Sequence, residues 1–470
     1  MAAIGGAAGT AAYSDTLVMF GASGDLAHKK LFPALWRLHR RGVLGMPVVG
    51  VALDDWTDDQ LRDRARSSIV EAGEPFDESE FATFAARLHY VSGNYAEAET
   101  FAAVAAAVGD AKHPLFHLAI PPSMFETVAD GLAGVGLHRG SRLVIEKPFG
   151  RDLDSAIALN AALHKHFDES AIFRIDHFLG KEALRSLLVS RFANAILEPI
   201  WNRHYVDAVM ITMSESFGVE DRGSFYDSVG ALRDVMQNHL MQMVALLTME
   251  QPVDESAKAL RDEVAKVLTG TRAVDPGHYV RGQYDGYLEV PGVDPASDTE
   301  TFGAFPLYID TPRWAGVPFY LRAGKALHET VTEMTVVFKP PAHGLWLDAG
   351  GAHPPNMIRI EAKPNAFSAI TWLRKQEGES MATEPITLAP PAEQRLDTGP
   401  EPYELLLHEA MRGDAMLFAR EDAIEQSWRI VEPLLAGVAP VKPYARASWG
   451  PADARRLPRQ HHGWPNEPPA

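Results

Sequence analysis

A charged cluster at residues 174–182 holds side chains suited to acid–base chemistry, in the order Arg-Ile-Asp-His-Phe-Leu-Gly-Lys-Glu. Asp176 stands beside His177, and Lys181 follows the histidine by four positions. A carboxylate can orient a base, and histidine and lysine can both donate hydrogen bonds to an anion. We therefore expect this segment to form one wall of a catalytic site that binds an anion.

A second charged cluster lies about sixty residues further on, inside an apolar run, and reads Arg-Asp-Val-Met-Gln-Asn-His-Leu at residues 233–240. Its His239 follows Val235 and Met236 and precedes Met243 at helical spacing, so it is predicted at the edge of a buried helix face. Histidine titrates near neutral pH and suits the role of a general base. We expect the two clusters to form two walls of one site.

A turn between a strand and a helix contains residues that could bind a dinucleotide: Gly21, Ala22, Ser23, Gly24, Asp25 and Leu26. Glycines let the backbone approach a pyrophosphate, and the amides of a helix N-terminus attract its charge. The Gly-x-x-Gly spacing differs from Gly-x-Gly-x-x-Gly, so a purely structural turn is an open alternative. A short-chain dehydrogenase is excluded, because none of the twelve tyrosines has lysine four positions on.

Strands and helices alternate in the first part of the chain, which predicts an α/β domain with a Rossmann-like, doubly wound parallel sheet. Its buried strands are expected at residues 16–20, 47–53, 115–120 and 142–146. After about residue 180, period-two alternation predicts an α+β domain with a large, mostly antiparallel sheet. Those strands are expected at 206–214, 301–309, 318–323, 332–339 and 356–362, with helices at 181–194, 230–250 and 403–435.

The length of 470 residues is too great for one compact core and predicts two domains. We expect a dinucleotide-binding domain over 15–178 and a substrate and dimerisation domain over 179–470, with a Pro-rich C-terminal tail. Residues 1–14 are rich in Ala and Gly and lack the pattern of a signal peptide, so a disordered tail is expected there.

The composition excludes several classes of function. A net charge of −18 disfavours nucleic acid and anionic membranes as partners. The absence of cysteine excludes disulfides, thiolate catalysis and cysteine-bound metals. No window approaches 18 consecutive apolar residues, so no membrane span is expected. The sequence predicts a cytoplasmic enzyme.

Five segments resemble, in order and at similar spacing, the signature blocks of the glucose-6-phosphate 1-dehydrogenase family: 21–27, 146–150, 174–182, 233–240 and 322–327. The resemblance extends from about residue 14 to the last predicted helix. It implies oxidation of glucose 6-phosphate at C1 to 6-phosphogluconolactone, the first step of the oxidative pentose phosphate pathway. The implied cofactor is NADP or NAD, no metal is implied, and a homodimer or homotetramer is expected.

The resemblance also implies the residues that carry the reaction. His239 would be the base and Asp176 its orienting carboxylate. His177 and Lys181 would bind the phosphate, and a lysine near a helix start suits that role. Lys147 would contact both the substrate and the cofactor.

Further positions are implied by the same blocks. Glu215, Asp234 and Lys325 match family positions that hold the sugar hydroxyls and the phosphate. Without the blocks, Glu215 and Asp234 would be read as ordinary surface acids. Pro148, which follows Lys147, is expected in the cis form.

Three departures from the family pattern concern the two ends of the site. Phe178 replaces a tyrosine, and Thr330 replaces a second basic residue that many members carry five positions past Lys325, so the phosphate end has fewer donors. Leu53 stands where the family has an arginine that binds NADP, and Asp54 follows it. A carboxylate there accepts a hydrogen bond from a ribose 2′-hydroxyl and repels a 2′-phosphate, which predicts tolerance of NAD.

Nearby cations could offset this repulsion, namely Arg62, Lys29 and Lys30. Two alternative functions are also open. The same site could oxidise another aldose phosphate, or the chain could be a non-catalytic regulator that binds a sugar phosphate or a nucleotide. The presence of both Asp176 and His239 argues against a regulator, because a protein without catalysis has no chemical need for the pair.

Overall fold

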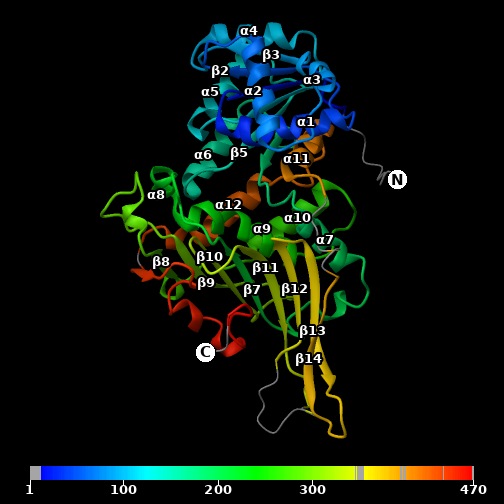
Figure 1. Ribbon diagram of the computed structural model, residues 1–470, viewed down its shortest axis with the longest axis vertical. Coiled ribbons are helices and arrows are strands. Elements are labelled where there is room, and N and C mark those ends of the chain that lie inside the picture. Colours follow the sequence, from blue (N-terminus) through cyan, green and yellow to red (C-terminus); the bar gives the residue numbers. More distant parts are fainter. Residues whose placement is uncertain are drawn as a thin grey trace. The chain divides into compact units, whose positions relative to one another are not determined.

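The computed structural model describes residues 12–343, 346, 354–391, 394, 399–437 and 439–467, which form two compact units (Figure 1). Among the described residues, the first unit takes in 12–180, 252–262 and 400–425, and the second takes in 181–251, 263–399 and 426–467. Residues 1–11 of the tail expected over 1–14 lie outside the described part. Ser14 is buried, and its N–H donates to the Met411 carbonyl at 2.8 Å.

The first unit is built on a parallel sheet of six strands in the order β3-β2-β1-β4-β5-β6. The strands are β1 (Thr16–Phe20), β2 (Val48–Ala52), β3 (Leu88–Ser92), β4 (Pro114–Leu118), β5 (Arg142–Glu146) and β6 (Ile172–Ile175). This order is that of doubly wound dinucleotide-binding folds, so the predicted Rossmann-like sheet is confirmed. The order reverses between β1 and β4, and ligands bind at such switch points.

The helices of this unit cover both faces of the sheet. They are α1 (Phe32–Arg40), α2 (Asp58–Glu71), α3 (Glu78–Ala85), α4 (Ala98–Val108), α5 (Phe125–Gly134), α6 (Leu153–His164) and α11 (Pro402–Arg412). Alternate residues of β1 serve the two cores: Leu17 and Met19 pack with α1, α2, α3 and α11, and Val18 and Phe20 pack with α4 and α5. Continuous apolar strands are therefore required, because both faces are buried.

Two strands of this sheet were missed by the sequence pattern. β3 is the edge strand, where His89 and Ser92 are exposed, so it lacks a continuous apolar run. β6 contains Arg174, which is fully buried and donates to Glu169 at 2.7 Å and to Asn160 at 2.9 Å. Because these partners satisfy the guanidinium, a charged residue is tolerated inside the core.

The second unit is built on a sheet of nine strands in the order β14-β13-β12-β11-β7-β10-β9-β8-β15 (Figure 1). The strands are β7 (Val206–Ser214), β8 (Val280–Tyr284), β9 (Phe302–Tyr308), β10 (Pro318–Gly324), β11 (Val331–Phe338), β12 (Met357–Lys363), β13 (Phe367–Lys375), β14 (Thr383–Leu388) and β15 (Val441–Tyr444). Neighbours are antiparallel except for the pairs β7–β10 and β8–β15. The predicted large, mostly antiparallel sheet is confirmed. The Pro-rich C-terminal segment supplies β15 and the buried Trp464.

The helices of the second unit are α7 (Glu182–Phe192), α8 (Gly223–Ala231), the π-type helix η5 (Leu232–Leu240) and α9 (Met241–Thr248). The helix predicted over 230–250 corresponds to η5 and α9 together, over 232–248, but the prediction missed the π-type turns of its first part. Gly230 has a non-helical φ of 64°, and the helix that follows it has wide turns before it becomes α-helical.

Two further helices, α10 (Ala257–Thr269) and α12 (Glu421–Val431), have residues in both units. The single helix predicted over 403–435 is wrong, because α11 ends at Gly413 in the left-handed conformation with φ 75°, and α12 starts again at Glu421. A glycine in that conformation is a common helix terminator. In the part of the chain that the structure describes, no helix is long and apolar enough to cross a membrane.

Candidate active site

The glycine turn joins β1 to the π-type helix η1 (Ala27–Leu31) and is fixed against the end of β2. The N–H groups of Gly21 and Ala22 both donate to the Val51 carbonyl, at 2.8 and 3.3 Å. Gly21 has a φ of 82°, and a Cβ at this position would lie 2.2 Å from the Ala119 carbonyl oxygen. Only glycine fits there, and the close backbone approach suits a pyrophosphate.

Gly21→Ala is expected to destabilise the protein by about 1–3 kcal/mol, because the added methyl group would overlap the Ala119 carbonyl in an unfavourable backbone conformation. It should also weaken the binding of NAD and NADP alike. Gly45→Ala is the matched control, since nothing lies within 4 Å of a Cβ at that position. Thermal unfolding and coenzyme titration measure both effects. Unchanged unfolding and binding in Gly21→Ala would contradict the assignment of this turn.

The end of β2 presents an acidic, solvent-facing edge. Leu53 is 72% exposed, and Asp54 beside it is exposed as well. The guanidinium of Arg62 is held by Asp59 at 2.8 Å and by the Ala85 carbonyl at 3.0 Å. Lys29 pairs with Asp25 at 2.8 Å, and Lys30 is exposed. Arg62 and Lys29 thus each have an acidic partner within the protein, and the tolerance of NAD stays a prediction.

Lys147 follows β5 and precedes Pro148 through a cis peptide bond, as expected. The residue before it, Glu146, is buried and has two partners. Its Oε1 lies 3.1 Å from Nε2 of His117, and its Oε2 accepts a hydrogen bond from the Tyr403 hydroxyl at 3.2 Å. Burial and the Glu146 carboxylate raise the pKa of Tyr403, so its hydroxyl remains a donor.

Asp176 and His177 follow β6 in the first unit. Asp176 is 3% exposed, and its Oδ1 accepts the Phe178 N–H at 3.0 Å. The ring of His177 stacks on that of Tyr403, with centroids 6.4 Å apart and planes 11° apart. Phe178 is buried and packs edge-on against His177 at 5.0 Å, so it acts as an apolar support and offers no donor.

In the second unit, Lys181 is the residue directly before α7. Its carbonyl accepts the Leu184 N–H at 3.1 Å, which starts the helix, and its side chain is half-buried. A cation at a helix start opposes the helix dipole, but free backbone N–H groups there favour an anion. Lys181 and this helix end can therefore bind a phosphate together.

Glu215 and Lys325 are brought together by the pairing of two parallel strands. Ser214 of β7 lies opposite Gly324 of β10, so the next residue of each strand leaves the sheet at the same edge. Their side chains form an ion pair there. This pair could hold the hydroxyls of a sugar, because it combines an acceptor and a charged donor.

Aromatic rings flank the Lys325 amine on two sides. Its Nζ lies 5.4 Å from the centre of the Phe217 ring and 5.5 Å from that of Tyr226. Thr330, at the position where the family carries a base, accepts the Ser216 N–H at 2.9 Å and thus holds the neighbouring loop. The ion pair with Glu215 and the two rings therefore hold the Lys325 amine in place. The Thr330 hydroxyl is used to hold the loop at Ser216.

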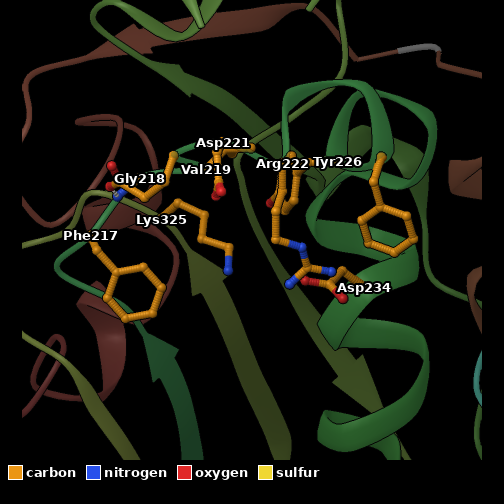
Figure 2. Close-up of a pocket in the computed structure, with 10 residues that line it drawn as sticks. Phe217, Gly218, Val219, Asp221, Arg222, Tyr226, Asp234 and Lys325 are labelled. Atoms are coloured by element: carbon orange, nitrogen blue, oxygen red, sulfur yellow. Dashed lines mark hydrogen bonds between the residues drawn. The ribbon is translucent and has the colours of Figure 1, made fainter. Parts of the chain in front are cut away.

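A pocket opens at this edge and is lined by Phe217, Gly218, Val219, Glu220, Asp221, Arg222, Phe225, Tyr226, Asp234 and Lys325. Figure 2 shows the Lys325 amine projecting into this space and the side chains of Arg222 and Asp234 pointing toward one another. Sequence reasoning did not single out Phe217, Tyr226 or Arg222. A signal for Arg222 was available in the charged run Glu220-Asp221-Arg222 ahead of α8.

Asp234 and His239 both belong to η5, and the wide turns of this helix decide how they face. In an α-helix, residues five apart point in directions about 140° apart. In a π-helix, hydrogen bonds join residues five apart, so that such side chains lie nearly above one another. His239 is 2% exposed. The side-chain amide of Asn238 beside it donates to the backbone carbonyls of Arg233 and Asp234 in the preceding turn, at 3.2 and 3.0 Å.

The predicted site residues are thus divided between the units. The first unit holds the glycine turn, Asp54, Lys147, Asp176 and His177, and the second holds Lys181, Glu215, Asp234, His239 and Lys325. Glu215 and Lys325 are in contact, and the pocket contains both Asp234 and Lys325. The expected pairing of Asp176 with His239 stays a prediction.

Two family models match nearly the whole chain. Residues 18–186 match the NAD binding domain of glucose-6-phosphate dehydrogenase, and residues 188–465 match its C-terminal domain. Glucose-6-phosphate 1-dehydrogenase 1 of Mycobacterium tuberculosis is 44% identical over 459 residues, which cover 96% of each chain.

Solved structures agree with these matches. The crystal structure of glucose-6-phosphate 1-dehydrogenase from Mycobacterium avium superposes with a TM-score of 0.91 at 45% identity, covering 97% of this chain and 99% of that one. A glucose-6-phosphate dehydrogenase in complex with its substrate glucose-6-phosphate gives a TM-score of 0.90 at 33% identity, covering 98% of this chain and all of that one. Because both family models and a relative of 44% identity cover nearly the whole sequence, this chain belongs to the glucose-6-phosphate dehydrogenase family.

Proposed function

We propose that the protein oxidises glucose 6-phosphate at C1 to 6-phosphogluconolactone, with NAD or NADP as the hydride acceptor. The observation that supports this most is the pocket lined by Asp234 and Lys325, where Lys325 forms an ion pair with Glu215. The buried His239 lies on the same helix, η5, as Asp234. These are the acceptors, the cation and the base that a hemiacetal oxidation needs.

In the proposed reaction, His239 removes the proton of the C1 hydroxyl while the C1 hydrogen leaves as hydride and the C1–O bond becomes a carbonyl. When bound, the nicotinamide accepts that hydride. Asp176 orients His239 and stabilises its protonated form. The proton and the hydride each have an acceptor, so the reaction requires no Lewis acid.

The remaining residues hold the substrate. Lys181 and His177 bind the 6-phosphate, and Lys147 contacts both sugar and coenzyme. Glu215, Asp234 and Lys325 hold the sugar hydroxyls. As part of the same proposal, the protein works in the cytoplasm and forms a homodimer or homotetramer. Its net charge of −18 disfavours nucleic acids and anionic membranes as partners.

Initial rates with glucose 6-phosphate and each of NAD and NADP are the test of this function. Turnover of a different aldose phosphate with much higher kcat/KM would replace glucose 6-phosphate as substrate. Binding of sugar phosphate and nucleotide without any turnover would identify a regulator instead.

NAD is expected to support turnover, with kcat/KM for NADP no more than about tenfold higher, a step of about 1.4 kcal/mol. The physical reason is the exposed Asp54 beside Leu53, since a 2′-phosphate next to a carboxylate costs on the order of 1 kcal/mol even when partly screened. Leu53→Arg combined with Asp54→Ser should shift the ratio toward NADP by at least about tenfold. A wild-type enzyme that does not use NAD would refute this expectation.

A further inference from the structure

Arg64 is a cation whose side chain reaches the glycine turn. It lies in the middle of α2, a helix whose first turn is fixed by a reciprocal cap between Thr57 and Gln60. Its Nη2 donates to the Ser23 carbonyl at 3.3 Å. The pKa of Asp25 is lowered first by its hydrogen bond to Lys29 and then by the charges of Lys29 and Arg64, so the charge of Arg64 acts on the turn.

The contact with Ser23 places Arg64 where the adenosine ribose binds in this fold. The Ala22 N–H donates to the Val51 carbonyl, so Ser23 and Leu53 each lie just beyond a point where the turn touches β2. In doubly wound folds, the adenosine ribose binds at the end of the second strand, beyond the glycine turn. Ser23, Leu53, Asp54 and Arg64 therefore border the same corner.

Neighbouring arginines of α2 are engaged elsewhere. Arg62 is held by Asp59 and by the carbonyls of Ala85 and Leu88. Arg66 pairs with Glu78 and lies over the rings of Phe76 and Phe81. Both guanidinium groups are thus directed at protein partners.

The guanidinium of Arg64 is bound less fully by the protein than those of Arg62 and Arg66. Among the residues that the structure describes, the Arg64 guanidinium makes one hydrogen bond, from Nη2 to the Ser23 carbonyl, while its Nε is buried without a partner. A guanidinium carries five N–H donors, and its planar fork suits a phosphate. A nearby arginine is also the general means by which this fold accepts a 2′-phosphate.

We propose that Arg64 binds the 2′-phosphate of NADP and thereby sets the coenzyme preference, in place of a cation at the end of β2. The assignment rests on the proposed function, in which the coenzyme lies at the glycine turn. The attraction of Arg64 for the 2′-phosphate opposes the repulsion by Asp54, and the two together give an enzyme that accepts both coenzymes.

The test compares Arg64→Ala with Arg66→Ala, a control on the same helix whose side chain is engaged by Glu78. Calorimetric titration with adenosine 2′,5′-bisphosphate and with 5′-AMP separates the 2′-phosphate from the rest of the nucleotide. Arg64→Ala should lose about ten- to hundredfold in affinity for the bisphosphate, the range for a charge-assisted hydrogen bond, and less than about twofold for 5′-AMP. Arg66→Ala should change neither affinity by more than about twofold.

Steady-state rates provide a second measurement. Arg64→Ala should lower kcat/KM for NADP by at least about tenfold and leave kcat/KM for NAD within about twofold. Arg64→Lys keeps a charge without the fork and should retain part of the bisphosphate affinity. Thermal unfolding of each variant shows that it is folded, and Arg64→Lys serves as the test if Arg64→Ala does not fold.

Equal losses for both nucleotides, or no loss for either, would overturn the assignment of Arg64. A wild-type protein that binds both nucleotides without oxidising glucose 6-phosphate would refute the proposed reaction, and Arg64 would still be judged by the two titrations. The failures of the two proposals are therefore distinguishable.

Discussion

Replacing His239 by asparagine is expected to lower kcat by about two to four orders of magnitude, the range for losing a general base. KM should change little, because the proton is transferred in the transition state and the ground-state contacts of the substrate remain. Asparagine keeps a polar side chain at this buried position on η5 but cannot take up the proton. Steady-state rates with glucose 6-phosphate measure both parameters.

His461→Asn is the matched control in the same unit. His461 lies beside a carboxylate, with its Nδ1 2.8 Å from Asp207, and it is outside the proposed site. Its replacement should leave kcat within about twofold, provided that thermal unfolding is unchanged. A His239→Asn enzyme with kcat within about threefold of wild type would remove His239 from the reaction.

The strands that position the site were largely predictable because their burial imposes a pattern. β1 is buried on both faces and must therefore be apolar throughout. The bounds of β7 and β10 agree with the strands that the alternation of apolar and polar residues predicted at 206–214 and 318–323. Arg174 shows the limit of this reasoning. A single charged residue interrupted the apolar run of β6, and only the fold supplies the Glu169 and Asn160 side chains that make its burial tolerable.

Contacts between distant residues could not be predicted from residue types. Glu215 and Lys325 meet because β7 and β10 pair in parallel in one particular register, and no local signal specifies that register. The position of Arg64 at Ser23 depends in the same way on how α2 packs against the glycine turn and against η1, where the Ser68 hydroxyl donates to the His28 carbonyl. Resemblance to the family identified Glu215 and Lys325 and gave no hint of Arg64.

The helix that carries His239 was predicted, but its geometry was not. A helical pattern over 230–250 implies ordinary turns of 3.6 residues, which would direct Asp234 and His239 to different sides. The wide turns of η5 bring residues five positions apart closer in direction than an α-helix would. At the start of η5 the Leu232 N–H donates to the buried Glu300 carboxylate at 3.0 Å, a tertiary contact that the periodicity of the sequence does not reveal.

The phosphate end of the site is proposed to depend on few donors. Phe178 is buried as an apolar side chain, and Thr330 is bonded to Ser216, so neither supplies the donor that the family pattern has at its position. Lys181 stands at the start of α7, where backbone N–H groups add to its charge. With fewer donors to share the phosphate, each remaining cation should carry a larger part of the binding.

Lys181→Ala is therefore expected to raise KM for glucose 6-phosphate by roughly ten- to hundredfold, the value of one charge-assisted hydrogen bond, and to lower kcat much less. Unphosphorylated glucose should be a poor substrate of the wild type and should be hardly affected by the change, because it lacks the group that Lys181 binds. Lys266→Ala removes a lysine of the same unit that is paired with Glu263 and should leave both parameters unchanged. Similar kcat/KM values of the wild type for glucose and glucose 6-phosphate would show that no phosphate site of this kind exists.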